Sequence, residues 1–198
     1  MTLQKMAASA GLAVGLAAAG CGVAAAAGTA AAGASTSSAN AGLAASRTVQ
    51  PVSSQDRMFM DQASQINLAE ISLGSHMLVH ATTTTAKDLG GTYARDHTAA
   101  QARLRVLALR LHVTLPGAPG AQLKSTAAQV EAQKGLSMDV AFAKASISGH
   151  EKAIAIFRKE ETAGSNAEVK AYAAHYLPML QTHLKLAKHA ESSMLPHS

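Results

Sequence analysis

The sequence is poor in the residues that stabilise many small domains. It has no tryptophan, one cysteine in 198 residues, and only 3% aromatic residues. A single cysteine cannot form an internal disulfide, so a disulfide-stabilised scaffold is excluded. The 48% hydrophobic content comes largely from small side chains such as alanine. Small side chains favour closely packed helices over the thick aromatic core of a β-sandwich.

Charged residues are also scarce, at 15%, and the formal net charge is +5. The basic residues are interspersed with acidic ones, and only Arg103, Arg105 and Arg110 lie close together, without neighbouring aromatic residues. Nucleic-acid-binding proteins concentrate basic residues in a patch, often beside aromatic residues. The charge pattern therefore argues against a nucleic-acid partner.

Residues 1–27 have the organisation of an export signal. Lys5 precedes an uncharged apolar stretch, residues 6–19, which is too short and too rich in alanine to favour a stable membrane span. Cleavage before Cys21, at a sequence similar to a lipobox, would leave a lipidated cysteine as a membrane tether. Cleavage in the alanine run at residues 24–28 would release a soluble protein, and an uncleaved anchor is the third alternative.

Residues 28–53 are mostly Ala, Ser, Gly and Thr, without hydrophobic periodicity. Such a segment buries too little apolar surface to become ordered. We therefore expect a disordered tether between the export signal and a domain formed by residues 54–195.

From Ser53 onward, apolar residues recur at alternating spacings of four and three, which is typical of helices that pack against other helices. Four such segments begin at candidate cap residues, namely Ser53, Thr85, Ser137 and Ser165. Pro116 and Gly164 mark two helix ends, and Pro178 should kink the last helix. A shorter helix is expected near residues 121–133. The pattern predicts an all-α fold, an antiparallel four-helix bundle with a short extra helix in its longer crossover.

Each of the four long helices carries one strongly polar residue within its apolar face. These residues are Glu70, His97, His150 and His183. Their burial is costly unless they bind each other, water or a metal ion. If two antiparallel helices are aligned about the middle of the loop that joins them, Glu70 lies level with His97. The same alignment offsets His150 from His183 by roughly 6 Å along the helix axis. Side chains that lean toward the N-terminus of their helices can close part of that gap.

One carboxylate and three imidazoles are suitable ligands for one transition metal ion, Zn, Fe, Mn or Cu. The Glu-x-x-His pairs of di-iron bundles are absent, because Ala94, Ile147 and Leu180 stand three positions before the histidines. The four residues therefore predict a mononuclear site. Alternatively, they form a hydrogen-bonded polar cluster without a metal, or some of them face solvent. Asp96 is expected to orient a histidine of an adjacent helix or to bind its neighbour Arg95, and not to be a ligand.

Six segments in order carry a resemblance to a known family. They are NLAEISLG at 67–74, Asp96-His97, Leu115-Pro116, GLSMDVAFAK at 135–144, GHEKAIAIFRKE at 149–160 and YLPMLQTHLKLAK at 176–188. Together they resemble the bacterial family called domain of unknown function 4142, DUF4142. Its members are exported and are often labelled outer-membrane or periplasmic proteins with a ferritin-like bundle. The resemblance implies that fold and a periplasmic or outer-membrane location, but no activity.

Three classes of function are compatible with these features. The domain could hold one metal ion for buffering or stress protection, or give that ion an open position for redox catalysis. It could instead be a structural or protein-interaction module of the cell envelope with a buried His/Glu cluster. The sequence contains no phosphate-binding loop, Ser-His-Asp set or paired carboxylates, so it supports no particular enzymatic reaction.

Overall fold

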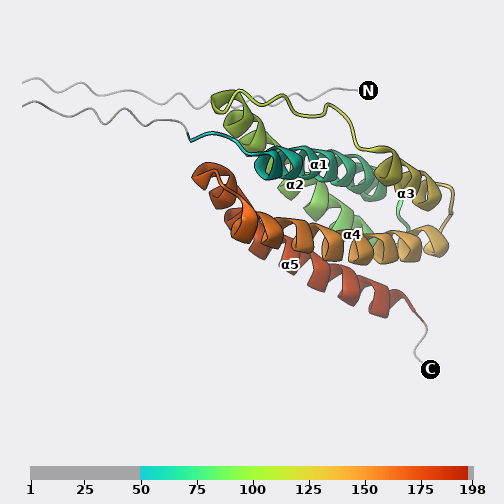
Figure 1. The fold of residues 1–198 in the computed structure, drawn as a ribbon. Coiled ribbons are helices and arrows are strands. Elements are labelled where there is room, and N and C mark those ends of the chain that lie inside the picture. The colour runs from blue at the N-terminus through green and yellow to red at the C-terminus, as the bar shows by residue number, and fades with distance from the viewer. Residues whose placement is uncertain (1–49, 196–198) are drawn as a thin grey trace, which may run out of the picture. The chain divides into compact units, whose positions relative to one another are not determined.

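The computed structural model describes residues 50–195 as an all-α domain (Figure 1). Its five helices are α1 (Ser54–His80), α2 (Thr84–Arg110), α3 (Ala121–Glu131), α4 (Leu136–Ala163) and α5 (Ala167–Met194). No strand forms within this range, as the helical periodicity predicted. The predicted export signal at 1–27 and most of the predicted tether at 28–53 lie outside the described residues.

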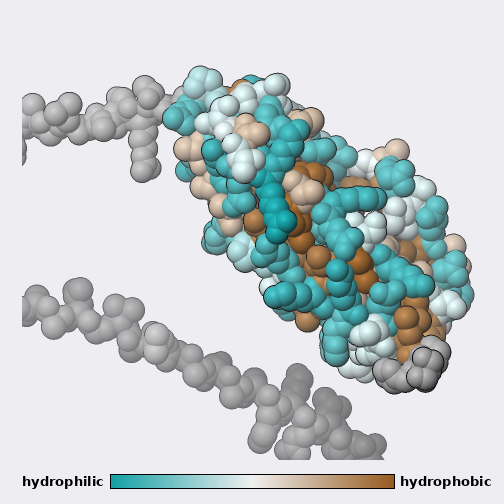
Figure 2. Space-filling model, turned by 60° about the horizontal axis from the view of Figure 1, so that its bottom comes forward, coloured by the Kyte–Doolittle hydropathy of each residue, from teal (hydrophilic) through white to brown (hydrophobic). Residues whose placement is uncertain are grey.

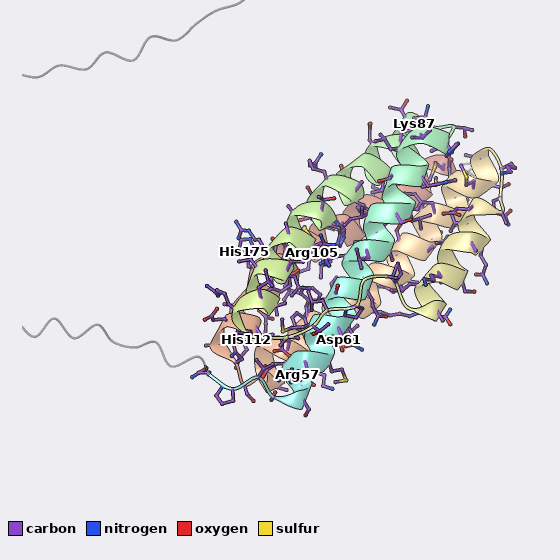
Figure 3. The ribbon with its side chains drawn as sticks, turned by 90° about the horizontal axis from the view of Figure 1, so that it is seen from above. Arg57, Asp61, Lys87, Arg105, His112 and His175 are labelled. Carbon is purple, nitrogen blue, oxygen red and sulfur yellow. The ribbon has the colours of Figure 1, made fainter. Side chains whose placement is uncertain are left out.

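The long helices pair as two hairpins, α1 with α2 and α4 with α5. Figure 3 shows this pairing for the first hairpin: Arg57, near the start of α1, lies at the same end as His112, just beyond α2. Lys87, at the start of α2, lies at the opposite end. The hairpins contact each other through α1 with α4 and α2 with α5, and α3 packs on α1 and α4. None of the helices in residues 50–195 combines the length and apolar character needed to cross a bilayer.

The core consists of two apolar clusters, one around Phe59, Leu104 and Phe157 and the other around Tyr93 and Phe142. Along each long helix, the members of one cluster precede those of the other, and the polar residues singled out above fall between them. The clusters therefore enclose a polar layer at mid-helix. On the face shown in Figure 2, hydrophilic side chains cover most of the surface, with a strip of apolar residues between them.

Two glycines allow α1 and α2 to approach closely. A Cβ atom on Gly90 would lie 2.7 Å from the backbone oxygen of Gly74 and 2.9 Å from Cβ of Met77. Neither obstacle is the flexible end of a side chain, so a larger residue requires the helices to separate.

We expect Gly90→Ala to destabilise the domain by about 1–3 kcal/mol, because overpacking would shift one helix backbone against the other. Gly91→Ala is the matched control, since its Cβ would meet only the flexible Leu78 side chain, at 3.2 Å. The control should be neutral or slightly stabilising, because alanine favours the helix. Chemical denaturation measures both variants, and equal stabilities would contradict the close approach.

An aspartate near the start of each hairpin binds the turn of the other hairpin. Asp56 accepts hydrogen bonds from the backbone N–H groups of Ser165 at 2.9 Å and Asn166 at 3.2 Å. Asp139 accepts from the Thr83 N–H at 2.7 Å and also from Thr82. The sequence separation between Asp56 and Asp139 is the same as that between Thr83 and Asn166. The two hairpins thus form a structural repeat, which was not predicted from the sequence.

The helix ends confirm one predicted cap and correct three. Ser53 caps α1, with the reciprocal Ser53–Asp56 hydrogen bonds of a capping box. The other caps are displaced by one or two residues, with Thr83, Gly135 and Asn166 in place of Thr85, Ser137 and Ser165. The long-range hydrogen bonds to the two aspartates fix the turns, and such bonds cannot be predicted from the spacing of residues within one segment. The second helix also stops at Arg110, before the predicted Pro116 end.

Candidate metal centre

Three of the four predicted ligands meet in the polar layer between the apolar clusters. His97 comes from α2, His150 from α4 and His183 from α5, and each is at most 1% exposed. One ring nitrogen from each lies within 4.8 Å of the others. The ring centroids are separated by 5.3, 5.3 and 5.9 Å, so the three imidazoles surround a common point.

Hydrogen bonds determine which nitrogen of two rings carries the proton in the neutral form. Nδ1 of His150 lies 2.9 Å from the carbonyl oxygen of Ser146, which can only accept, so Nδ1 donates. Nε2 of His183 lies 3.0 Å from a carboxylate oxygen of Asp96 and also donates. The remaining nitrogens, Nε2 of His150 and Nδ1 of His183, face each other at 3.3 Å. In neutral rings both are lone-pair acceptors, with no hydrogen between them.

A chain of hydrogen bonds from Pro116 orients the third ring. Ser64 donates to the Pro116 carbonyl oxygen at 3.1 Å and accepts from the Gln101 amide at 2.9 Å. The Gln101 side-chain oxygen accepts from the Asn67 amide at 3.1 Å. The Asn67 oxygen therefore accepts from Nδ1 of His97 at 2.9 Å. Nε2 of His97 is left buried, without a hydrogen-bond partner in residues 50–195.

The three clustered rings thus carry three buried lone pairs without a donor, an arrangement that is unfavourable unless a cation lies among them. A proton can bridge only one pair, whereas a metal ion can accept all three. In a tetrahedral site with metal–nitrogen bonds of about 2.0–2.1 Å, two ligand nitrogens lie about 3.3 Å apart. The distance from His150 to His183 is 3.3 Å. Each ring also donates its other N–H to an oxygen, as metal-bound histidines usually do.

The surroundings favour the neutral, metal-binding form of the rings. Burial lowers the pKa of His97 well below 6.5, and the nearby His150 and His183 lower it further. Burial also lowers the pKa of His183 to about 4, against the opposing effect of its hydrogen bond to Asp96. Metal ions bind neutral imidazole. At neutral pH, His97 and His183 are therefore in the form that binds a metal.

Glu70, the predicted fourth ligand, is not among the converging side chains. The turn between α1 and α2 is centred on Thr82, so Asn67 lies level with His97, which corrects the predicted alignment of Glu70. Glu70 is half-buried, and its Oε1 lies 3.7 Å from the position that a Cβ on Gly149 would occupy. Burial raises the pKa of Glu70, and the nearby His150 partly opposes this. The carboxylate stands beside the histidine cluster, at the edge of a cleft.

Several residues of the site were missed or only partly recognised from sequence. Asp96 orients His183, as predicted. Asn67 and Gln101 were missed because they lie beside the residues that recur at spacings of four and three. The buried face of a helix is wider than the face that those residues form. Tyr93 packs against His150 and His183 with ring centroids 4.8 and 4.6 Å apart, a contact that the sequence pattern did not predict. Its hydroxyl donates to the backbone oxygen of His183 at 3.0 Å.

Comparisons with known proteins support the fold. A family described as "Domain of unknown function (DUF4142)" matches residues 40–190. No curated protein matches the chain. A solved DUF305 fragment from Deinococcus radiodurans has a TM-score of 0.64 at 14% identity, covering 73% of this chain and 99% of that chain. A candidate spore coat protein from Bacillus halodurans has a TM-score of 0.59 at 15% identity, covering 75% and 94%. At these identities the structural likeness shows a shared helical fold.

Proposed function

The chain belongs to the DUF4142 family, and we propose that its helical domain binds one transition metal ion through His97, His150 and His183. The observation that carries the proposal is the set of three buried nitrogen lone pairs, one on each of the clustered histidine rings, that lack a donor. Neutral imidazoles suit Zn, Fe, Mn or Cu. The role of such a site would be metal buffering or stress protection.

The proposal extends to architecture and location. The four long helices are arranged as an antiparallel four-helix bundle of the ferritin-like kind, which the pairing of the two hairpins supports. The N-terminal pattern supports export to the periplasm or the outer membrane, with or without a tether through lipidated Cys21. A metal site in that compartment would act on ions before they enter the cytoplasm.

A second candidate is a structural or protein-interaction module of the cell envelope in which the histidines only fix the packing of the helices. The hydrogen-bonded chain from Pro116 to His97 favours this alternative, because such networks specify one arrangement of a core. Without a metal ion, the lone pairs of His97, His150 and His183 have no donor, which is why we rank this candidate second.

Metal analysis of the full-length chain, purified without a histidine tag, distinguishes the two candidates. We expect close to one transition metal ion per chain after loading and removal of free metal. A chelator should then lower the melting temperature by roughly 5–10 °C, because a tightly bound ion stabilises only the folded state. Metal well below one ion per chain, with no effect of the chelator, would support the structural module.

A further inference from the structure

A cleft of about 640 Å³ opens between α1, α3 and α4. Its walls are mostly apolar, with contributions from Ile66, Leu73, Leu123, Ala127 and Ile156. Three other lining residues, Glu70, Ser146 and Gly149, lie next to His150. Ser146 accepts the hydrogen bond from the His150 ring, and Gly149 precedes it in the chain. The cleft therefore leads from solvent to the edge of the histidine cluster.

The carboxylate at this edge is free to bind a cation. Glu70 is the only acidic residue that lines the cleft, which also has Lys144 and Lys152 in its walls. None of the ion pairs within residues 50–195 involves Glu70, and no group in that range donates a hydrogen bond to it. Asp96, the carboxylate on the other side of the cluster, already binds His183 at 3.0 Å and Arg95 at 2.9 Å. Partly buried carboxylates are normally paired. Of these two carboxylates, Glu70 is the one with unused acceptor capacity.

Charge balance gives Glu70 a second role. Three neutral imidazoles contribute no charge, and the Asp96 carboxylate already forms an ion pair with Arg95 at 2.9 Å, so neither offsets the charge of a divalent ion. An uncompensated buried charge is strongly unfavourable. The Glu70 carboxylate would supply a negative charge that no ion pair already uses, and it lies close enough to interact with His150.

We infer that Glu70 is the entrance residue of the metal site: it captures a divalent transition metal ion from the cleft and compensates the charge of the filled site. The inference rests on the proposed metal-binding function. The histidines are at most 1% exposed, so a hydrated ion does not meet them directly. Gly149 leaves space beside the carboxylate, because even a Cβ there would lie 3.7 Å from Oε1 of Glu70.

Cobalt(II) is a suitable probe, because its visible absorption reports binding and coordination. Stopped-flow mixing with the metal-free full-length chain gives the uptake rate, and competition with a chelator gives the affinity. We expect Glu70→Gln to slow uptake by about tenfold or more and to weaken affinity, because the attracting charge is lost. Glu151→Gln, which removes an exposed carboxylate of α4 outside the cleft, is the matched control and should change neither.

Gly149→Val separates the effect of the open space beside Glu70 from the effect of the Glu70 charge. A valine there would narrow the space beside Glu70 but leave the ligands and the charges in place. It should slow uptake and loss of cobalt(II) to a similar extent, with little change in affinity. The melting temperatures of the metal-free variants show whether each one is folded before the rates are compared.

The outcomes separate this inference from the proposed function. If the native chain binds no cobalt(II), the proposed function fails. If the native chain binds cobalt(II) and Glu70→Gln takes it up at the native rate and affinity, the histidine site stands and the role of Glu70 is overturned. The role of Glu70 is also overturned if Asp96→Asn slows uptake and Glu70→Gln does not.

Discussion

His183→Gln is expected to weaken binding of a transition metal ion by at least about a hundredfold. The substitution removes one of three nitrogen ligands, and loss of a partner that only orients a ligand already costs 10- to 100-fold in other metal sites. The glutamine also breaks the hydrogen bond that Asp96 accepts from Nε2 of His183. Competition against a chromophoric chelator, with the full-length chain, measures the affinity.

His175→Gln is the control for this substitution. His175 lies on the same helix, is exposed, and contacts Arg103 rather than the buried cluster. The His175→Gln variant should bind the metal with native affinity. Native affinity in the His183→Gln variant would show that the ion is held elsewhere, by surface histidines or by the N-terminal residues.

Glu160→Gln is expected to stabilise the domain by about 2–3 kcal/mol at pH 8 and to have little effect near pH 4.5. Glu160 is fully buried; its Oε2 accepts a hydrogen bond from Gln55 at 3.1 Å, and its Oε1 has no partner within residues 50–195. Burial raises the pKa of Glu160 to about 7, the bond from Gln55 partly opposes this, and the Asp56 carboxylate adds to it. Glutamine resembles the protonated form and carries no charge at any pH.

The direction of the pH dependence follows from proton binding. The folded chain holds the Glu160 proton up to about pH 7, whereas the unfolded chain releases it near pH 4.5. The stabilising contribution of the protonated group is complete below pH 4.5 and is lost as the pH rises through 7. Asp56 does not titrate in this window, because hydrogen bonds from Ser53 and Asn166 outweigh the effect of burial and hold its pKa at about 2.

Urea denaturation between pH 4.5 and 8.5 tests this prediction, with the difference between variant and native stability as the readout. Glu161→Gln is the control, because that neighbouring side chain is only partly buried. Its difference from native should stay nearly constant with pH. A Glu160→Gln difference that is equally flat would mean that Glu160 is already ionised in the folded chain at low pH.

The all-α fold was predictable because the packing of helices against one another determines the spacing of apolar residues in the sequence. Phe59 and Phe157 of one apolar cluster and Tyr93 of the other follow that spacing, whereas Phe142 lies beside it. The caps of α2 and α5 were not predictable from it, since Asp139 and Asp56 fix those turns across the interface between hairpins. Contacts between residues far apart in the sequence have no local signature.

The three histidines of the site were predictable because strongly polar residues within an apolar stripe are rare and costly. The relative heights of the helices were less certain, since an error of one or two residues in the centre of a turn shifts one helix against its partner by several ångströms. That shift is the reason Asn67, and not Glu70, binds His97. The chain through Ser64 and Gln101 requires tertiary contacts that no spacing rule supplies.

The site also breaks the repeat that relates the two hairpins. Phe59 and Tyr93 of the first hairpin have Phe142 and Tyr176 as their counterparts in the second, at the same separation as the paired aspartates. At the site the counterparts differ: Asn67 corresponds to His150, His97 to Leu180, and Ala100 to His183. The shared positions maintain the packing and the turns. The differing positions bring together three histidines and the amide that orients one of them.

The most direct test of the metal site is X-ray absorption spectroscopy of the full-length chain loaded with one equivalent of zinc or cobalt. We expect three imidazole nitrogens at about 2.0–2.1 Å from the ion, with oxygen completing the coordination. Multiple scattering from the histidine rings identifies the nitrogen ligands. A first coordination sphere made only of oxygen, without the scattering of histidine rings, would contradict the site at His97, His150 and His183.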